Sequence, residues 1–257
     1  MPPGEDLACA VSNTRASATL TLVKAWADAL PGETATVSSS GFGSNASSGL
    51  SSADASGNNS TTGTPVTVYA GETGTISETL SNAGNYDATL SCTGNAQDPV
   101  GNSLTIDPSD TAITCTYANT RRSINLTLEK QWVGAAVGEQ VEVSATGSFT
   151  GTISLDSTAD SASEVDAAAA QPVYAGETIT LAEAFAAPAN AANYTSVLTC
   201  TGNGTPLSGS TLTVGAGDTG ITCRYTNTRL QTTLQLNKAW GTGSRVGDQA
   251  QLAATAG

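Results

Sequence analysis

The lysines are the residues of this 257-residue sequence whose spacing most strongly suggests chemistry. There are three, Lys24, Lys130 and Lys238, and each lies in the phrase Leu-x-Lys-x-Trp after an alternating apolar run. Because residues two apart lie on one face of a β-strand, each lysine should point inward with its leucines and tryptophan. An unpaired buried ammonium costs several kcal/mol, so each lysine should be paired, deprotonated or chemically consumed.

Two other polar residue types share this inward register. Asn119 and Asn227 end alternating strands near the close of each repeat, and Glu78 and Glu183 stand among apolar residues in the middle of each repeat. We therefore predict that one lysine, one glutamate and one asparagine meet in the core of each repeat.

Such a triad permits the formation of an amide crosslink. Burial disfavours the charged forms of both the amine and the carboxylic acid. A neutral lysine amine can attack the asparagine carboxamide carbon while the protonated glutamate polarises the oxygen and transfers protons, and ammonia leaves. The product would join the first and last strands of a repeat.

Two simpler arrangements remain open. Each lysine could form an ion pair with the glutamate while its stem packs on the tryptophan. The asparagine could instead bridge backbone groups where the chain turns into the next domain.

The lysines recur about every 107 residues, a size that suits one small β domain. Each repeat carries about seven short strands separated by turn residues, which predicts an all-β fold of tandem immunoglobulin-like sandwiches. The predicted divisions are 1–15, a closing strand of a truncated preceding repeat; 16–122 and 123–230, the two sandwiches; and 231–257, the opening strands of a truncated following repeat.

Two polar, variable segments are expected to be exposed: 41–63, as a loop or a short edge hairpin, and 156–170, as a loop. Only one or two residues separate Arg121 or Arg229 from the next expected strand. Such short links favour a stiff rod.

The cysteines follow the same repeat. Cys92 and Cys115 have the same separation as Cys200 and Cys223, and each pair is expected to join the last two strands of its repeat. Cys9 is left without a partner. Regular disulfides favour an extracellular, oxidising location.

Composition excludes several functions. A net charge of −13 argues against nucleic-acid binding, and the absence of histidine leaves no usual hydrolase triad. No signal peptide or membrane-spanning run is expected in this stretch. Asp107, Asp110 and Asp218 do not make a legible cation ligand set, so neither a metal nor another cofactor is predicted.

The order of lysine, glutamate and asparagine in opening, middle and closing strands resembles the SpaA-like and collagen-adhesin B-type prealbumin-fold domains of bacterial surface adhesins and pili. The resemblance implies spontaneous isopeptide bonds that form in a single turnover, without enzymatic activity on other molecules. The implied sets are Lys24 with Asn119, assisted by Glu78, and Lys130 with Asn227, assisted by Glu183; Lys238 and Asn13 would lack partners. The disulfides and the tryptophan depart from the usual pilin domain.

The sequence therefore predicts a stalk or filament segment of an extracellular bacterial adhesin or surface fibre. The expected partners are neighbouring repeats or like subunits arranged head to tail, and strand addition is one way in which subunits could be joined. The alternative is a binding module in which segments 41–63 and 156–170 contact a host or matrix ligand. Neither nucleic-acid binding nor membrane insertion is expected of this segment.

Overall fold

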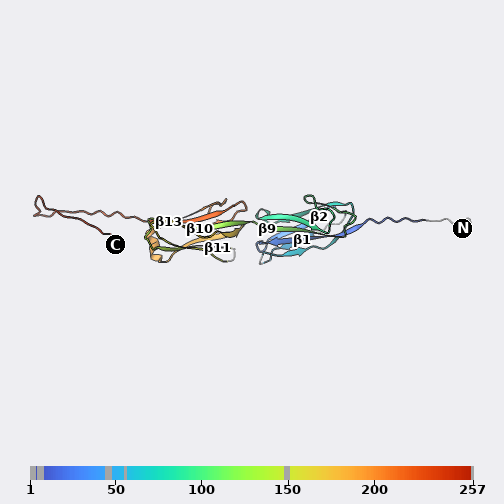
Figure 1. The fold of residues 1–257 in the computed structure, drawn as a ribbon, viewed down its shortest axis with the longest axis horizontal. Coiled ribbons are helices and arrows are strands. Elements are labelled where there is room, and N and C mark those ends of the chain that lie inside the picture. Colours follow the sequence, from blue (N-terminus) through green and yellow to red (C-terminus); the bar gives the residue numbers. More distant parts are fainter. Residues whose placement is uncertain (1–3, 5–8, 44–47, 55–56, 148–150, 256–257) are drawn as a thin grey trace.

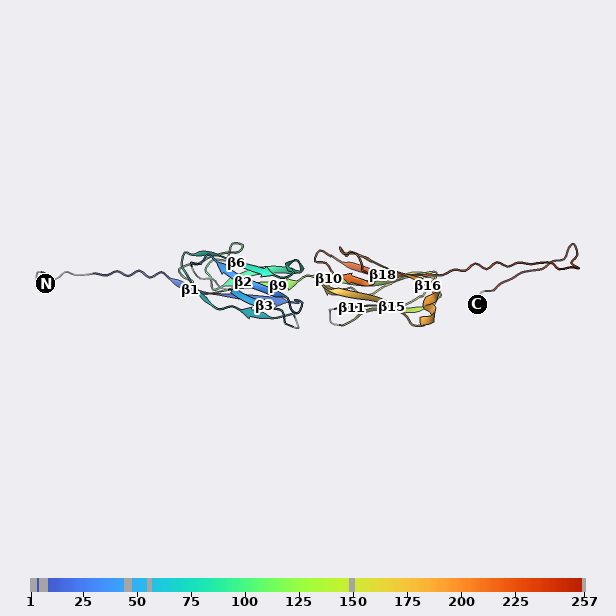
Figure 2. The same cartoon turned by 180° about the vertical axis from the view of Figure 1, so that it is seen from behind.

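The computed structural model describes residues 4, 9–43, 48–54, 57–147 and 151–255. Two β-sandwiches lie end to end, and the N-terminal and C-terminal segments leave from opposite ends of the pair (Figure 1). The view from behind shows the same arrangement (Figure 2). The predicted all-β class and the tandem organisation are thus confirmed.

The first sandwich is built from two facing sheets. One has the order β4-β1-β9-β7, with β5 also paired to β1, and the other has the order β3-β2-β6-β8. The strands are β1 (Ser17–Ala27), β2 (Thr34–Ser40), β3 (Ser48–Ser52), β4 (Ser60–Thr62), β5 (Val66–Tyr69), β6 (Thr73–Leu80), β7 (Tyr86–Thr93), β8 (Ser103–Thr105) and β9 (Ala112–Arg121). A short 3-10 helix, η1 (Ala83–Asn85), precedes β7.

The second sandwich repeats this topology. Its sheets have the orders β13-β10-β18-β16, with β14 also on β10, and β12-β11-β15-β17. The strands are β10 (Ser123–Val133), β11 (Gln140–Gly147), β12 (Ile153–Thr158), β13 (Ser163–Ala167), β14 (Gln171–Tyr174), β15 (Thr178–Phe185), β16 (Tyr194–Thr201), β17 (Thr211–Thr213) and β18 (Ile221–Arg229). The 3-10 helix η2 (Pro188–Asn193) matches η1.

The first and last long strands of each sandwich are parallel neighbours. β1 pairs with β9, and β10 pairs with β18. Alternate residues of β1 and β10 are buried, as the sequence pattern predicts, and Leu20, Leu22, Leu126 and Leu128 have no exposed surface. Each such leucine contributes roughly 1.5–3 kcal/mol through burial.

The variable segments are not simple loops. Strands β3 and β4 lie within 41–63, and β12 and β13 cover much of 156–170. The segments supply the edge strands of both sheets rather than one hairpin, because β3 pairs with β2 whereas β4 pairs with β1. Serine and threonine side chains such as Ser52, Ser60 and Ser163 are exposed, and pairing satisfies the backbone groups. The loop expectation is therefore wrong for 156–170.

The two disulfides pair as predicted, but the strands differ from the expectation. Cys92–Cys115 joins β7 to β9, and Cys200–Cys223 joins β16 to β18. These strands are not consecutive, because β8 and β17 intervene in sequence and lie in the opposite sheet.

The expected strands outside the two sandwiches are absent from the described residues. Residues 9–16 and 231–255 carry no strand, and Asn13, Lys238 and Trp240 are exposed. Part of the closing strand expected within residues 1–15 falls outside the described residues. A lone strand has neither ladder partners nor a covering sheet, which explains why the local pattern does not fold by itself. Cys9 is exposed and free.

Candidate functional site

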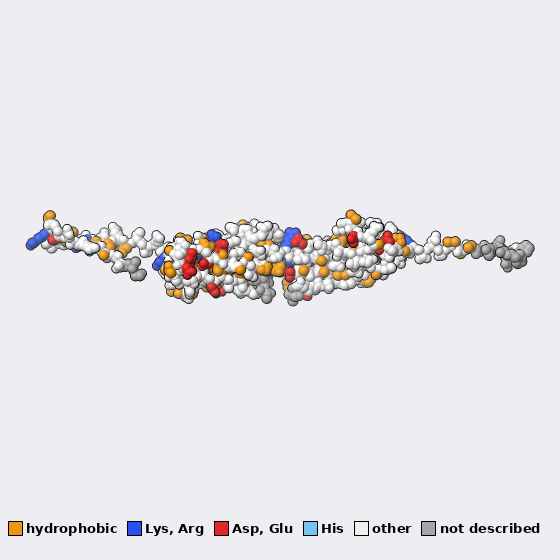
Figure 3. Space-filling model, viewed as in Figure 1, with side chains coloured by type: hydrophobic (Ala, Val, Ile, Leu, Met, Phe, Trp, Pro, Cys, Tyr) orange, Lys and Arg blue, Asp and Glu red, His pale blue; other side chains and the backbone are white. Residues whose placement is uncertain are grey.

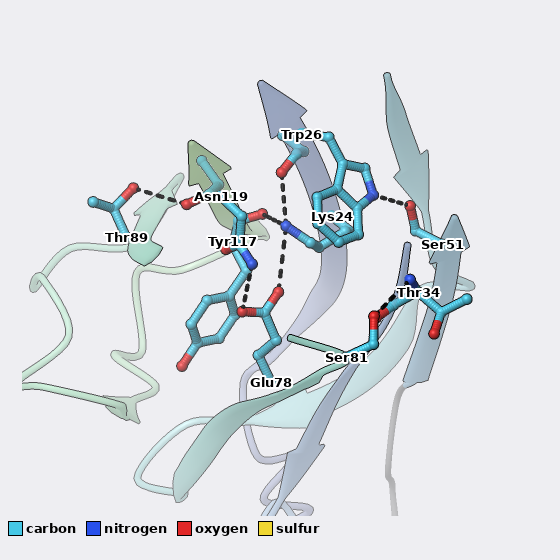
Figure 4. Close-up of polar contacts among 11 residues, drawn as sticks. Lys24, Trp26, Thr34, Ser51, Glu78, Ser81, Thr89, Tyr117 and Asn119 are labelled. Carbon is cyan, nitrogen blue, oxygen red and sulfur yellow. Dashed lines mark hydrogen bonds and ion pairs between the residues drawn. The ribbon is translucent and has the colours of Figure 1, made fainter. Parts of the chain in front are cut away.

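The predicted triad of the first sandwich is assembled around one carboxylate (Figure 4). Lys24 Nζ lies 3.3 Å from Glu78 Oε1. The Asn119 amide Nδ2 donates to the other oxygen, Glu78 Oε2, at 3.0 Å. A single glutamate thus contacts both groups that a crosslink would join.

The second sandwich contains the equivalent triad, but here the lysine and the asparagine contact the same carboxylate oxygen. Lys130 Nζ lies 2.9 Å from Glu183 Oε1, and Asn227 Nδ2 donates to Glu183 Oε1 at 3.0 Å. The Ser196 hydroxyl donates to Glu183 Oε2 at 2.9 Å, so this carboxylate has an additional partner.

Sheet geometry brings these residues together from distant parts of the sequence. In the β1–β9 ladder, Lys24 stands opposite Tyr117, and Asn119 stands one inward position further along β9. Glu78 lies on β6 of the facing sheet and therefore reaches both across the core. The second sandwich has the same register, with Lys130 opposite Tyr225.

The site is dry. Lys24 is 1% exposed, and Lys130, Asn119 and Asn227 are 0% exposed. Burial lowers the pKa of both lysines, although the adjacent glutamate opposes this shift in each case. The direction favours the neutral amine, the nucleophilic form.

The asparagine carboxamides contribute an uncompensated acceptor at each site. Asn119 Oδ1 and Asn227 Oδ1 are buried and have no hydrogen-bond donor among the described residues. Such an acceptor is costly to bury. It is also the oxygen that a proton donor would polarise during attack on the carboxamide carbon.

Each ammonium is covered by an indole ring. Lys24 Nζ lies 4.0 Å from the Trp26 ring centroid, and Lys130 Nζ lies 4.2 Å from that of Trp132. Lys238 shows the same contact with Trp240 at 4.5 Å in an exposed segment. The Lys-x-Trp contact therefore forms between neighbouring residues without the sandwich. Folding of the sandwich then brings the glutamate and the asparagine to the lysine.

Sequence reasoning missed the serines that hold these indoles. Trp26 Nε1 donates to Ser51 Oγ, and Trp132 Nε1 donates to Ser157 Oγ, each at 2.8 Å. Both serines are buried and lie on the edge strands β3 and β12. Their segments are rich in serine and threonine, so only the matching offset from each tryptophan could have singled them out.

The acidic residues considered as cation ligands stabilise backbone turns. Asp110 accepts from the backbone N–H groups of Ala96 and Asp107, and Asp218 accepts from those of Gly204 and Gly215. Asp107 accepts from Ser109, which lowers the pKa of its carboxyl group. Both carboxylate oxygens of Asp110 and of Asp218 thus accept hydrogen bonds from backbone N–H groups.

The two sandwiches are tandem prealbumin-like domains. The family model of the SpaA prealbumin-like fold domain matches residues 31–121 and again residues 125–229, and the chain belongs to this family. Among curated proteins, none matches. Within the described residues, no helix has the length and apolar character needed to cross a bilayer.

Similar solved structures include major pilin proteins of two Streptococcus pyogenes serotypes. One has 13% identity and a TM-score of 0.43, covering 84% of this chain and 98% of the pilin. The other has 10% identity and a TM-score of 0.45, covering 83% and 98%. A C-terminal fragment of the pilus adhesin SpaC from Lactobacillus rhamnosus GG has 15% identity and a TM-score of 0.39, covering 85% and 100%.

Proposed function

We propose that this chain is a stalk or filament segment of an extracellular surface adhesin or fibre, closed in each repeat by an isopeptide bond. The observation that carries the proposal is the buried carboxylate that contacts both the lysine of the first strand and the asparagine of the last. Membership of the SpaA family, and disulfides suited to an oxidising compartment, agree with it.

The proposed reaction needs no external reagent. Neutral Lys24 Nζ attacks Asn119 Cγ, Glu78 transfers protons, and the carboxamide nitrogen leaves as ammonia. One C–N bond forms and one breaks, and no oxidation or reduction occurs. Lys130, Asn227 and Glu183 would do the same in the second sandwich. Each site reacts once, so the chemistry builds the protein and is not a turnover activity.

The placement of the bond suits a load-bearing role. Within our proposed repeats 16–122 and 123–230, tension would enter through β1 or β10 and leave through β9 or β18. A bond from Lys24 to Asn119 would carry that tension directly between the two strands. Residues between the bonded positions would then be shielded from extension.

Single-molecule force spectroscopy tests this role. We expect the native chain to show no unfolding step from either sandwich. The Lys24→Ala variant should show one unfolding step, from the first sandwich alone. The released length should exclude the residues held by Cys92–Cys115 until the disulfide is reduced. Asn119→Ala should behave in the same way as Lys24→Ala.

The chain offers a matched control in Lys238→Ala, because Lys238 has the same Lys-x-Trp contact but is exposed. This variant should give the same force–extension trace as the native chain. Stepwise extension of both sandwiches in the native chain would contradict the proposed crosslinked stalk.

A further inference from the structure

A second repeated contact lies outside the triads, where the two sandwiches meet. Arg121, which closes the Asn-Thr-Arg ending of β9, reaches the turn formed by residues 174–177, Tyr-Ala-Gly-Glu. Its Nε donates to the Ala175 carbonyl oxygen at 2.7 Å, and its Nη1 lies 3.6 Å from Glu177 Oε1. Its guanidinium carbon lies 5.6 Å from the Tyr174 ring centroid.

The same three contacts occur one repeat earlier. Arg15 ends the Asn-Thr-Arg sequence that precedes β1, and residues 69–72 form the equivalent Tyr-Ala-Gly-Glu turn. Arg15 Nε donates to the Ala70 carbonyl oxygen at 2.7 Å, and Nη1 lies 3.4 Å from Glu72 Oε1. Its guanidinium carbon lies 5.7 Å from the Tyr69 ring centroid.

Each turn is preorganised to receive an arginine. One oxygen of the turn glutamate accepts from the backbone N–H of the turn tyrosine, Glu72 from Tyr69 at 3.0 Å and Glu177 from Tyr174 at 2.9 Å. The other oxygen is left for the guanidinium. The fork of an arginine can reach the carbonyl and the carboxylate together, which a lysine ammonium matches poorly.

The arginine needs no folded domain behind it to make these contacts. No strand precedes Arg15 in the described residues, and its side chain is 52% exposed, yet it contacts the turn as Arg121 does. At the junction the Arg121 and Glu177 side chains are only 4% and 3% exposed. The arginine therefore recognises the turn itself. Packing of the neighbouring sandwich then buries the arginine and the turn glutamate.

The junction itself is tight. Arg122 alone separates β9 from β10; its backbone N–H donates to the Asn85 carbonyl, and its carbonyl accepts from the Ala175 N–H. A Cβ on Gly176 would lie 2.6 Å from Asn85 Nδ2 of the first sandwich. Figure 3 shows basic and acidic side chains gathered at this boundary.

We propose that the Tyr-Ala-Gly-Glu turn is a binding site for the arginine that closes the preceding repeat, and that this contact fixes successive sandwiches in one orientation. A desolvated ion pair is weak evidence for stability but can specify geometry. Arg229 holds the third equivalent position and is exposed. The partner whose chemistry fits it is the same turn on another copy of the repeat.

Residual dipolar couplings of the complete chain test the proposal, because two sandwiches held in one orientation share one alignment tensor. The wild-type couplings should fit a single tensor, and Arg121→Ala should lose this common fit while each sandwich still fits its own. Arg122→Ala is the matched control. It removes the adjacent charge, whose side chain instead contacts Asp87 of the first sandwich, and it should keep the common tensor.

A common tensor in folded Arg121→Ala would overturn the proposal, as would an equal loss of the common fit in Arg122→Ala. If Arg121→Ala does not fold, Glu177→Gln decides, because it removes the charge at nearly constant shape. Loss of the common tensor in Glu177→Gln supports the proposal, and its retention overturns it.

Discussion

At the scale of single residues, the site is governed by the cost of burying an ammonium beside a carboxylate. Lys24 and Lys130 lie in positions where burial disfavours their charge, and Glu78 and Glu183 are the groups that offset this cost. Removing one partner of such a pair is more damaging than replacing both, because the other remains buried. Both lysines should therefore be sensitive to changes in their glutamates.

The lysine pKa shifts predict a pH dependence in a chain that cannot crosslink. In Asn119→Ala/Asn227→Ala both lysines stay free amines, and their folded pKa lies below the ordinary 10.5. Between the lowered pKa and 10.5 the folded state binds fewer protons than the unfolded state. The free energy of unfolding should therefore rise with pH in this window.

Urea titrations at a series of alkaline pH values measure this slope. Adding Lys24→Met and Lys130→Met to this variant should reduce the slope of the free energy of unfolding against pH. Tyr117 and Tyr225 act oppositely, because burial raises the pKa of each phenol, so stability is lost as pH climbs beyond about 10. A free energy of unfolding that falls throughout the lysine window would contradict the assignment.

The indole contact gives a second prediction. Trp26→Phe removes the donor to Ser51 and leaves that buried hydroxyl without it, so the first sandwich should lose about 1–3 kcal/mol. Trp240→Phe is the control, because Trp240 is 50% exposed and should change stability little. Chemical denaturation of the two variants measures the difference. Equal, negligible effects would show that the indole hydrogen bond is unimportant.

The triad could be predicted from the sequence because period-two burial places every second residue of a strand on one face. Lysine, glutamate and asparagine were conspicuous there among apolar neighbours. Ser51 and Ser157 could not be separated from their polar surroundings by the same pattern. Their role depends on how edge strands fold over the tryptophans, which is a tertiary effect.

At the scale of elements, the β1–β9 ladder sets the position of the lysine relative to the asparagine. Parallel pairing runs from Thr19 opposite Ala112 to Ala27 opposite Thr120, so the register is fixed over the whole strand. The disulfide acts elsewhere, between β7 and β9. The proposed isopeptide bond and the disulfide should therefore form independently.

Cys92→Ala/Cys115→Ala tests this independence. Crosslinking at Lys24 should persist in this variant because the ladder remains, while the first sandwich should lose about 3 kcal/mol from the opened loop. Intact mass reports the crosslink, and denaturant titration reports the stability. Cys9→Ser, which removes the free cysteine, serves as the control. Loss of the crosslink in the disulfide variant would mean that the disulfide sets the register.

The edge strands show where sequence reasoning fails at this scale. Long strands β1 and β10 have clear alternation, but β3, β4 and β13 are short and polar, so their hydrophobic pattern is weak. Their pairing is decided by the backbone groups of β1, β2 and β10, which need partners. The position and pairing of such strands therefore depend more on the neighbouring strands than on their own residues.

At the scale of the whole molecule, the two sandwiches form an elongated pair with a one-residue link (Figure 1). The short link could be predicted from the sequence. The Arg121 contact was missed because it joins residues 54 apart, from two repeats. The recurrence of Asn-Thr-Arg and of Tyr-Ala-Gly-Glu was visible, but only the structure places one against the other.

Covalent closure of each sandwich is the central claim, and intact mass under reducing, denaturing conditions tests it most directly. We predict that the mass falls short of the sequence mass by two ammonia molecules. The deficit should fall to one in Lys24→Ala or Glu78→Gln and vanish when Lys130→Ala is added to Lys24→Ala, while Lys238→Ala keeps both. A native mass equal to the sequence mass would contradict the account and leave the triads as buried ion pairs.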